Sequence, residues 1–227
     1  MREKHPEEFQ FYPLTWNLPR DLRKLEEHME TKKAASFQHA LLTNSHKHHQ
    51  DPIYIVKPEA ACQGKGIFLI KDVKDIEAGY ASGYSRMEAY HSDIKMFDQG
   101  HCVVQEYISK PLLIDKMKFD LRLYVAVLGV DPLRIFLFKD GLARLATSAY
   151  SKPSDQNMGN MQMHLTNYAI NKHSLAFMKN YTAVADFVGS KRSLKFVMRY
   201  LKKTLKADTT KLMREIKDMT IKTIISA

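Results

Sequence analysis

The sequence has no apolar run approaching the ~20 residues that a membrane-spanning helix needs. Its first residues are polar and do not form a signal peptide. Only two cysteines, Cys62 and Cys102, occur among 227 residues, which excludes a disulfide framework. These absences predict a reduced intracellular protein, whose hydrophobic content of 44% is enough for one large domain or two small ones.

The sequence also lacks the phosphate-binding motifs that open a helix. Gly64-Lys65-Gly66 is followed by Ile67-Phe68-Leu69, whereas a P-loop needs Lys-Ser or Lys-Thr running into a helix. The third glycine of a dinucleotide fingerprint is missing as well. Apolar runs on both sides of the glycines predict a β-hairpin over residues 53–70. Its glycines let the backbone approach phosphate oxygens, and a plain β-turn is the alternative.

The positive charge is concentrated in the last quarter of the chain. Residues 1–170 carry 22 Lys and Arg against 21 Asp and Glu, whereas residues 171–227 carry 13 against 4. A region of net charge +9 attracts acidic peptides, nucleic acid or an anionic membrane surface. The alternative is a basic helix face that is simply solvated.

Hydrophobic periodicity predicts helices and strands along most of the chain. Helices are expected over 21–42, 193–206 and 208–226, and a strand over 103–108. Strands at 120–127, 134–138 and 142–146 are expected to form a three-stranded antiparallel meander, with turns at Gly129–Pro132 and Lys139–Gly141. Polar loops are expected over 43–52, 71–100 and 150–162.

Several polar residues stand where these strands begin or end. Lys57 can hold a phosphate as a point charge, Asp120 can accept hydrogen bonds from ribose hydroxyls, and Arg144 suits a carboxylate or phosphate. Each has an ordinary alternative, such as a surface lysine or a cross-strand ion pair of the Asp120-Leu121-Arg122 segment. The histidines at 46, 48 and 49 are a conceivable metal site, but a solvated loop is the better interpretation.

The order of these motifs strongly resembles the tubulin tyrosine ligase-like family, and within it the polyglutamylases. The resemblance is carried by Lys57-Pro58, Gln63-Gly64-Lys65-Gly66-Ile67, Val104-Gln105-Glu106-Tyr107-Ile108, Lys118-Phe119-Asp120-Leu121-Arg122, Asp140-Gly141-Leu142-Ala143-Arg144 and His164-Leu165-Thr166-Asn167-Tyr168. It extends from Phe11-Tyr12-Pro13 to Ile221-Lys222-Thr223, apart from expanded loops near 78–100 and 150–162.

The resemblance implies an α+β, ATP-grasp-like fold in which antiparallel sheets with flanking helices hold ATP. It implies an N-terminal segment and linker over 1–52, a central lobe over 53–109 and a C-terminal lobe over 110–227. The residues it implies for the ATP site are Lys57, Gln63, Gly64, Gln105, Glu106, Tyr107, Ile108, Lys118, Phe119, Asp120, Thr166 and Asn167. Around the incoming glutamate it implies Gln63, Arg144, Ala169 through its backbone, and Lys191, with Arg144 and Lys191 in catalytic roles.

The implied activity is ATP-dependent ligation of glutamate onto tubulin C-terminal tails through an acyl phosphate. Glutamine at the position of Gln63 suggests elongation of glutamate chains rather than their initiation. Tubulin or microtubules and free glutamate are the implied partners, with no nucleic acid and no membrane. The implied location is the cytoplasm and cytoskeleton, including the cilium axoneme or basal body.

Magnesium is also implied, but its ligands in this family, an Asp and a later Glu-x-Asn, lie on strands beyond the Lys-Thr-Ile-Ile segment that ends this chain. Asp155-Gln156-Asn157 has acidic-x-amide spacing but lies in a loop, so no metal ligand is expected within residues 1–227. Two explanations remain open. The chain is a fragment of an active ligase, or it is a short inactive relative that serves as a microtubule-binding structural protein of cilia.

Overall fold

The computed structural model describes residues 2, 4–42, 51–76, 101–179 and 189–226. These residues form two compact units of α+β structure. One unit contains residues 13–111 and 151–161, and the other contains residues 1–12, 112–150 and 162–227. Each unit has its own antiparallel sheet of four strands.

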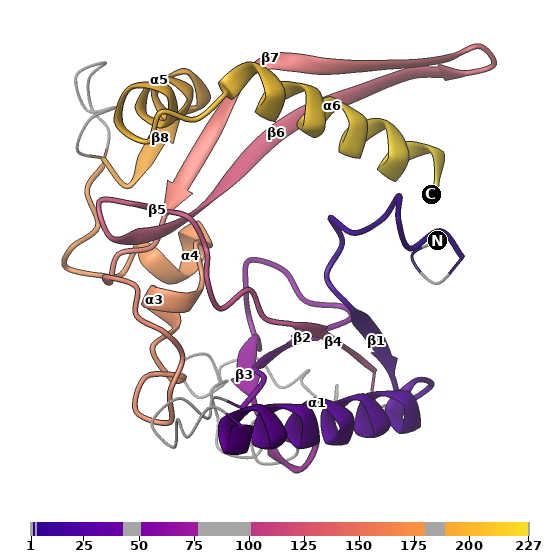
Figure 1. The fold of residues 1–227 in the computed structure, drawn as a ribbon. Coiled ribbons are helices and arrows are strands. Elements are labelled where there is room, and N and C mark those ends of the chain that lie inside the picture. Colours follow the sequence, from indigo (N-terminus) through magenta and orange to yellow (C-terminus); the bar gives the residue numbers. More distant parts are fainter. Residues whose placement is uncertain (1, 3, 43–50, 77–100, 180–188, 227) are drawn as a thin grey trace. The chain divides into compact units, whose positions relative to one another are not determined.

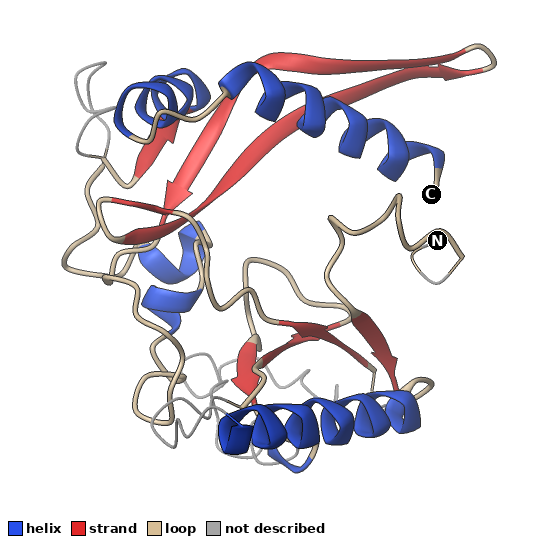
Figure 2. Ribbon diagram, viewed as in Figure 1, coloured by secondary structure: helices blue, strands red, loops and turns tan. Residues whose placement is uncertain are grey.

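The sheet of the first unit, residues 13–111 with 151–161, has the strand order β1-β4-β2-β3. Its elements are β1 (Thr15–Leu18), α1 (Leu22–Leu42), β2 (Tyr54–Pro58), β3 (Phe68–Ile70) and β4 (Cys102–Glu106). Helix α1 lies along one face of the sheet (Figure 2), where Leu25 and Met29 join a hydrophobic core with Trp16, Tyr54 and Val56. Because side chains alternate between the two faces of a strand, Thr15, Lys57 and Gln105 lie on the opposite face.

The predicted helix over 21–42 and the predicted hairpin over 53–70 are confirmed. Strands β2 and β3 pair antiparallel, with Tyr54 opposite Ile70 and Val56 opposite Phe68. The connection between them is a loop of turns that leads into a strand and not into a helix. This geometry is inconsistent with a P-loop and agrees with the sequence pattern.

The second unit, residues 1–12, 112–150 and 162–227, is built on a long two-stranded ribbon (Figure 1). Strands β6 (Met117–Val130) and β7 (Leu133–Leu145) form the ribbon, and short strands β5 (Leu113–Ile114) and β8 (Lys191–Ser193) flank its base. The helices are α3 (Met161–His164), α4 (Tyr168–Asn171), α5 (Leu194–Thr204) and α6 (Thr209–Ile225). Phe196, Val197 and Leu201 of α5 pack on Ala143 and Leu145 of β7.

The predicted three-stranded meander is wrong, because Lys139-Asp140-Gly141 lies within β7 and does not form a turn. Gly141 pairs with Leu123, and the ladder shifts register between Leu123 and Val125. A Cβ atom at Gly141 would lie 2.6 Å from the carbonyl oxygen of Arg122. The glycine therefore marks a close backbone approach beside an irregularity in the ladder, which a sequence pattern cannot distinguish from a turn.

The two predicted C-terminal helices are confirmed as α5 and α6, and each begins at a capping side chain. The Ser193 hydroxyl accepts a hydrogen bond from Phe196 N, and the Asp208 carboxylate accepts from Thr210 N and Lys211 N. These backbone hydrogen bonds lower the pKa of Asp208. Capping by Ser and Asp satisfies amide groups that have no partner within the helix.

Candidate functional site

A chain of hydrogen bonds crosses three strands of the first sheet, on the face away from α1. Lys57 Nζ donates to Gln105 Oε1 at 2.7 Å, and Gln105 Nε2 donates to Thr15 Oγ1 at 2.8 Å. Burial lowers the pKa of Lys57. In the part of the chain that the structure describes, no carboxylate forms an ion pair with Lys57. A half-buried cation fixed by a neutral amide is suited to bind an anion such as phosphate.

The loop between β2 and β3 contains three residues in the left-handed region. Gln63, Gly64 and Gly66 have φ of 61°, 87° and 67°. A Cβ atom at Gly66 would lie 2.8 Å from Cγ of Pro58, so only glycine fits there without a shift. The Gln63 side chain is exposed at the surface of this loop. The loop thus presents backbone amides and a glutamine next to the strand that carries Lys57.

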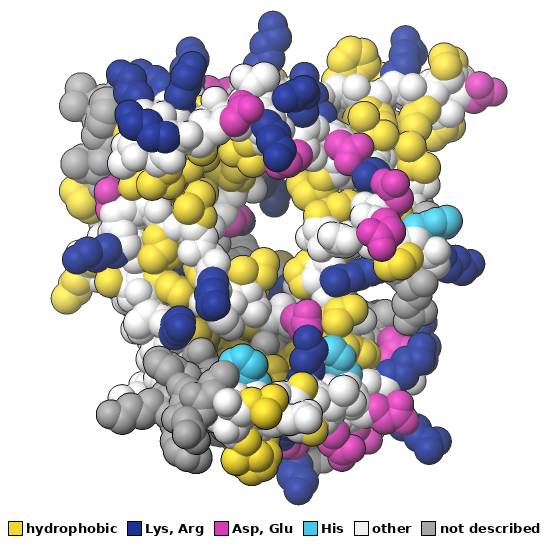
Figure 3. Space-filling model, viewed as in Figure 1, with side chains coloured by type: hydrophobic (Ala, Val, Ile, Leu, Met, Phe, Trp, Pro, Cys, Tyr) yellow, Lys and Arg dark blue, Asp and Glu magenta, His cyan; other side chains and the backbone are white. Residues whose placement is uncertain are grey.

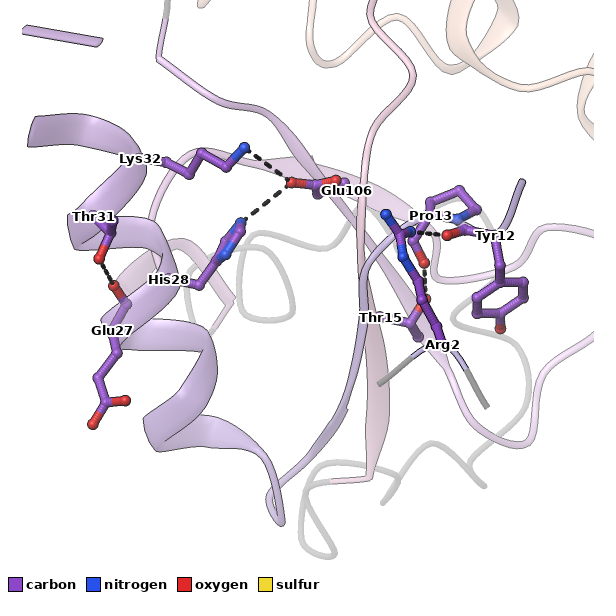
Figure 4. Close-up of polar contacts among 9 residues, drawn as sticks. All are labelled: Arg2, Tyr12, Pro13, Thr15, Glu27, His28, Thr31, Lys32 and Glu106. Atoms are coloured by element: carbon purple, nitrogen blue, oxygen red, sulfur yellow. Dashed lines mark hydrogen bonds and ion pairs between the residues drawn. The ribbon is translucent and has the colours of Figure 1, made fainter. Parts of the chain in front are cut away.

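The end of β4 is held by residues of α1 (Figure 4). The Glu106 carboxylate lies 3.2 Å from His28 Nε2 and 3.7 Å from Lys32 Nζ. The His28 ring in turn packs on Trp16, with ring centroids 4.8 Å apart. Since His28 and Lys32 are one helical turn apart, both reach the same oxygen. This support for the predicted nucleotide-binding segment Gln105–Ile108 was missed in the sequence, where the His-x-x-x-Lys spacing is its only signal.

Tyr54 of β2 lies opposite Glu106 of β4, and its hydroxyl is buried. Among the described residues, no group forms a hydrogen bond with this hydroxyl. Burial, and then the nearby charge of Glu106, raise the pKa of Tyr54 to about 12. Beyond Glu106, the Tyr107 side chain is buried, whereas the Ile108 side chain is 59% exposed. An exposed apolar side chain after a strand end can pack on the face of a base.

In the second unit, Asp120 and Arg144 form a bidentate pair across β6 and β7. Arg144 Nε donates to Asp120 Oδ1 at 3.0 Å, and Arg144 Nη2 donates to Asp120 Oδ2. The hydrogen bonds that Arg144 donates to the Asp120 carboxylate raise the pKa of Arg144. The alternative interpretation of this segment as part of a cross-strand ion pair is confirmed for Asp120, because the register places Asp120 opposite Arg144.

Lys118 and Phe119 precede Asp120 in β6, and their side chains make different contacts. Lys118 Nζ donates to the His164 carbonyl at 2.9 Å, which ties β6 to the segment before Thr166. The Phe119 side chain packs against the hydrophobic core of this unit.

Three of the predicted site residues meet in one small pocket of the second unit. Its lining consists of Arg144, Leu145, Thr166, Tyr168, Asn171, Phe177, Ser190 and Lys191. Arg144 and Lys191 are direct neighbours in the β7–β8 ladder, and Lys191 Nζ lies 4.1 Å from the centre of the Tyr168 ring. The cavity that these residues enclose has a volume of about 10 Å³, roughly one water molecule, so it is not itself a ligand-sized site. What the residues provide is a cluster of two cations and a hydroxyl, a combination suited to small anions.

The loop that precedes α4 supplies the remaining predicted residues. Asn167 occupies the N-cap position of α4, but its side chain makes no capping hydrogen bond. Ala169 follows within α4 and does not line the pocket. Asn167 therefore holds the N-cap position of α4 without capping the helix through its side chain. Tyr168 and Asn171 were missed in the sequence, where they are polar members of the Leu165–Lys172 run.

Basic side chains gather on α5 and the start of α6 (Figure 3). Lys195, Arg199 and Lys202 are exposed and recur at helical spacing on one face of α5. Beside them lies a groove lined by Met198, Thr209, Thr210, Met213, Arg214 and Lys217. Within the described residues, no acidic side chain forms an ion pair with Lys195, Lys202, Arg214 or Lys217. The basic stripe of Lys195, Arg199 and Lys202, together with this groove, forms a surface suited to an acidic peptide.

No cluster of three or more His, Cys, Asp or Glu side chains occurs in the described ranges. The Asp155 carboxylate pairs with Lys71, and Asn157 donates to Ser151 and Lys152 within its own loop. The histidines at 46, 48 and 49 lie outside the described residues. Among the helices in the described residues, none is both long and apolar enough to span a membrane.

Comparison with known proteins gives consistent matches over the whole chain. The tubulin-tyrosine ligase family matches residues 1–227. The chain is 40% identical over 227 residues to a probable beta-tubulin polyglutamylase of Tetrahymena thermophila, of which it covers 16%. It is 40% identical over 227 residues to tubulin polyglutamylase TTLL6 of Mus musculus, of which it covers 22%. It is 39% identical over 226 residues to tubulin polyglutamylase TTLL11 of Mus musculus, of which it covers 27%. In each case 100% of this chain is aligned. The chain spans less than a third of the length of each of these relatives.

Proposed function

Because the chain belongs to the tubulin-tyrosine ligase family, we propose that it takes part in ATP-dependent ligation of glutamate onto glutamate residues of tubulin tails. The observation that carries this proposal is the clustering of Arg144 and Lys191, which pair across β7 and β8, with Thr166. The relatives named above are tubulin polyglutamylases, which supports the same assignment.

Free glutamate is the proposed small ligand of the cluster formed by Arg144 and Lys191. At neutral pH it carries two carboxylates, and Arg144 and Lys191 supply two cations on adjacent strands. The Asp120 carboxylate holds the Arg144 guanidinium in a fixed plane, so the guanidinium loses less freedom when it binds a carboxylate. The backbone of Ala169 is proposed to contact the same ligand from α4.

ATP is the proposed co-substrate. Lys57 supplies an amine whose pKa is already lowered by burial, and binding a phosphate would restore the stability of its charged form. The Gln63–Gly64 turn supplies backbone amides, which can contact phosphate oxygens. The backbone of Gln105–Ile108 is proposed to bind the base, and Asp120, Lys118, Thr166 and Asn167 are proposed to contact the rest of the nucleotide.

The proposed reaction has two steps. A side-chain or terminal carboxylate of the acceptor attacks the γ-phosphorus of ATP, the bond to ADP breaks, and an acyl phosphate forms. The amine of free glutamate then attacks the acyl carbon, an amide bond forms, and inorganic phosphate leaves with the proton of the amine taken up by solvent. Lys57, Arg144 and Lys191 offset the negative charges that gather in both steps. No step is assigned to magnesium, because the described residues do not form a site for it.

An acidic tail is the proposed acceptor, which gives the basic surface of α5 and α6 a ligand. Tubulin tails are rich in glutamate, and charge complementarity increases the rate of association. Gln63 is proposed to favour elongation of glutamate chains, so Gln63→Arg should shift the products toward initiation. The proposed location follows the substrate, in the cytoskeleton and in cilia.

The test is incorporation of isotope-labelled glutamate into tubulin by the longest polypeptide that the gene encodes, compared with Arg144→Lys and Lys191→Gln. Incorporation that requires ATP and falls at least about tenfold in both variants supports the proposal. Wild-type rates in both variants would contradict the site assignment. Microtubule binding without any incorporation would favour the second candidate, a structural microtubule-binding protein of cilia. The stripe of exposed basic side chains on α5, Lys195, Arg199 and Lys202, is the observation that favours this candidate.

A further inference from the structure

Asn171, at the last position of α4, is a buried polar residue to which the proposed reaction assigns no role. Only 1% of its surface is exposed, yet it lines the same pocket as Arg144 and Thr166. A buried carboxamide is costly unless its donors and acceptor are all used. The partners of Asn171 therefore indicate what it does.

Every hydrogen-bonding position of the Asn171 amide is occupied. Its Oδ1 accepts from Thr147 N at 2.9 Å and from Thr147 Oγ1 at 2.8 Å. Its Nδ2 donates to the Leu165 carbonyl at 2.8 Å and to the Asn167 carbonyl at 3.0 Å. Among side chains of this length, only asparagine offers an acceptor on one side and two donors on the other.

These hydrogen bonds join two segments that both carry predicted site residues. Thr147 follows β7, the strand of Arg144, and Ala146 before it is fixed by a hydrogen bond to the Lys118 carbonyl at 2.8 Å. Leu165 and Asn167 stand on either side of Thr166. One side chain therefore fixes Thr166 from both directions relative to the strand that carries Arg144.

The same contacts leave the Asn167 side chain available. As the N-cap residue of α4, Asn167 is expected to turn its side chain onto the helix amides, but it makes no capping hydrogen bond. Its carbonyl instead accepts from Asn171 N at 3.1 Å and from Asn171 Nδ2. The Asn167 backbone is thus held by Asn171 without the use of its own amide.

We propose that Asn171 is a positioning residue that couples the nucleotide-binding residues Thr166 and Asn167 to Arg144 through Thr147. This inference rests on the proposed function, because it presumes that Thr166 and Asn167 contact ATP. Asn171 acts through these residues and does not itself touch the substrate. A residue that only stabilised the fold would change the unfolding midpoint without changing the affinity of folded protein for ATP.

Two sets of variants separate the two sides of the Asn171 amide. Asn171→Asp keeps an acceptor for Thr147 but places a carboxylate oxygen against the carbonyls of Leu165 and Asn167. Thr147→Val removes one hydrogen bond on the other side, and Thr147→Ser retains it. Binding of a fluorescent ATP analogue by the 227-residue chain is measured on protein shown by circular dichroism and urea unfolding to be folded.

We expect Asn171→Asp to weaken ATP binding at least about tenfold, and Thr147→Val to weaken it about threefold with recovery in Thr147→Ser. Wild-type affinity in folded Asn171→Asp would overturn this inference alone. Failure of the wild-type chain to bind the analogue would overturn the proposed nucleotide site, and this inference with it. If Asn171→Asp does not fold, equal affinities of Thr147→Val and Thr147→Ser would overturn the inference.

Discussion

Asp120 and Arg144 face each other across β6 and β7 and are joined by two hydrogen bonds. The pair places a planar guanidinium at the rim of a pocket that also contains Lys191. A lysine at position 144 would keep the charge but lose the two parallel hydrogen bonds. The pair therefore offers a way to separate the geometry of this cation from its charge.

Arg144→Lys is expected to raise the KM for glutamate at least about tenfold, with a smaller change in the KM for ATP. Because the ion pair is partly exposed, its loss should cost only about 1 kcal/mol of unfolding free energy or less. Steady-state kinetics and urea unfolding measure the two effects. Arg134→Lys is the matched control, since Arg134 is an exposed residue of the same strand. An equal change of KM in both variants would contradict the assigned role of Arg144.

Lys57→Met is expected to abolish ATP binding without loss of stability in the free protein. Burial lowers the pKa of Lys57 in the folded state, so its charged form opposes folding at neutral pH. This penalty is fully present below the folded-state pKa of Lys57. It is lost as the pH rises from that pKa to the ordinary pKa of lysine, which applies in the unfolded state. The stability of wild type should therefore rise relative to Lys57→Met between neutral and alkaline pH.

Urea unfolding at a series of pH values measures this difference, and equilibrium binding of ATP measures the loss of function. Lys24→Met on the exposed surface of α1 is the control for removal of a charge. If Lys57→Met were less stable than wild type at every pH, Lys57 would stabilise the fold, and its charge would not be a cost that ligand binding offsets.

Tyr54→Phe is expected to increase the unfolding free energy by about 1 kcal/mol, because it removes a buried hydroxyl that no described residue satisfies. The folded-state pKa of Tyr54 is raised from 10.0 to about 12. Folded protein therefore holds this proton at a pH where unfolded protein releases it, and wild-type stability should fall between pH 10 and 12. The fall should be smaller in Tyr54→Phe. Thermal unfolding with Tyr12→Phe as an exposed control measures both effects.

Lys195→Gln with Lys202→Gln is expected to weaken binding of a polyglutamate peptide several-fold and to reduce the salt dependence of binding. The fold should be unaffected, because both side chains are exposed on α5. Fluorescence anisotropy at a series of salt concentrations measures the effect. The pair Lys24→Gln and Lys116→Gln removes the same charge from other surfaces. If the control pair weakened binding equally, net charge rather than this surface would attract the peptide.

Elements with strong local signals could be predicted from the sequence. Helices α5 and α6 follow the helical spacing of apolar residues, α1 begins shortly after Pro19, and the β2–β3 hairpin follows from two apolar runs around Gly64 and Gly66. Strands β1, β5 and β8 have only 4, 2 and 3 residues and were missed. Such strands form because a longer partner is already in place, which is a tertiary effect and leaves little local pattern.

The same limit applies to the site. Individual residues such as Lys57 and Arg144 stand out because charged groups occur at strand positions. The contacts of Lys191 with Arg144 and of Asn171 with Thr147 depend on pairing between distant segments. The Asp140-Gly141 pair misled the prediction because glycine is common both in turns and where two backbones approach closely.

The β6–β7 ribbon has a practical consequence for handling the protein. In the described residues, β5 and β8 pair only with its base, so the outer backbone of each strand is uncovered toward the tip. Phe136 and Phe138 add exposed aromatic surface there, at 53% and 61%. Uncovered strand edges with apolar side chains promote intermolecular pairing. At high concentration, aggregation through these strand edges is therefore expected to limit purification of the 227-residue chain more than thermal unfolding does.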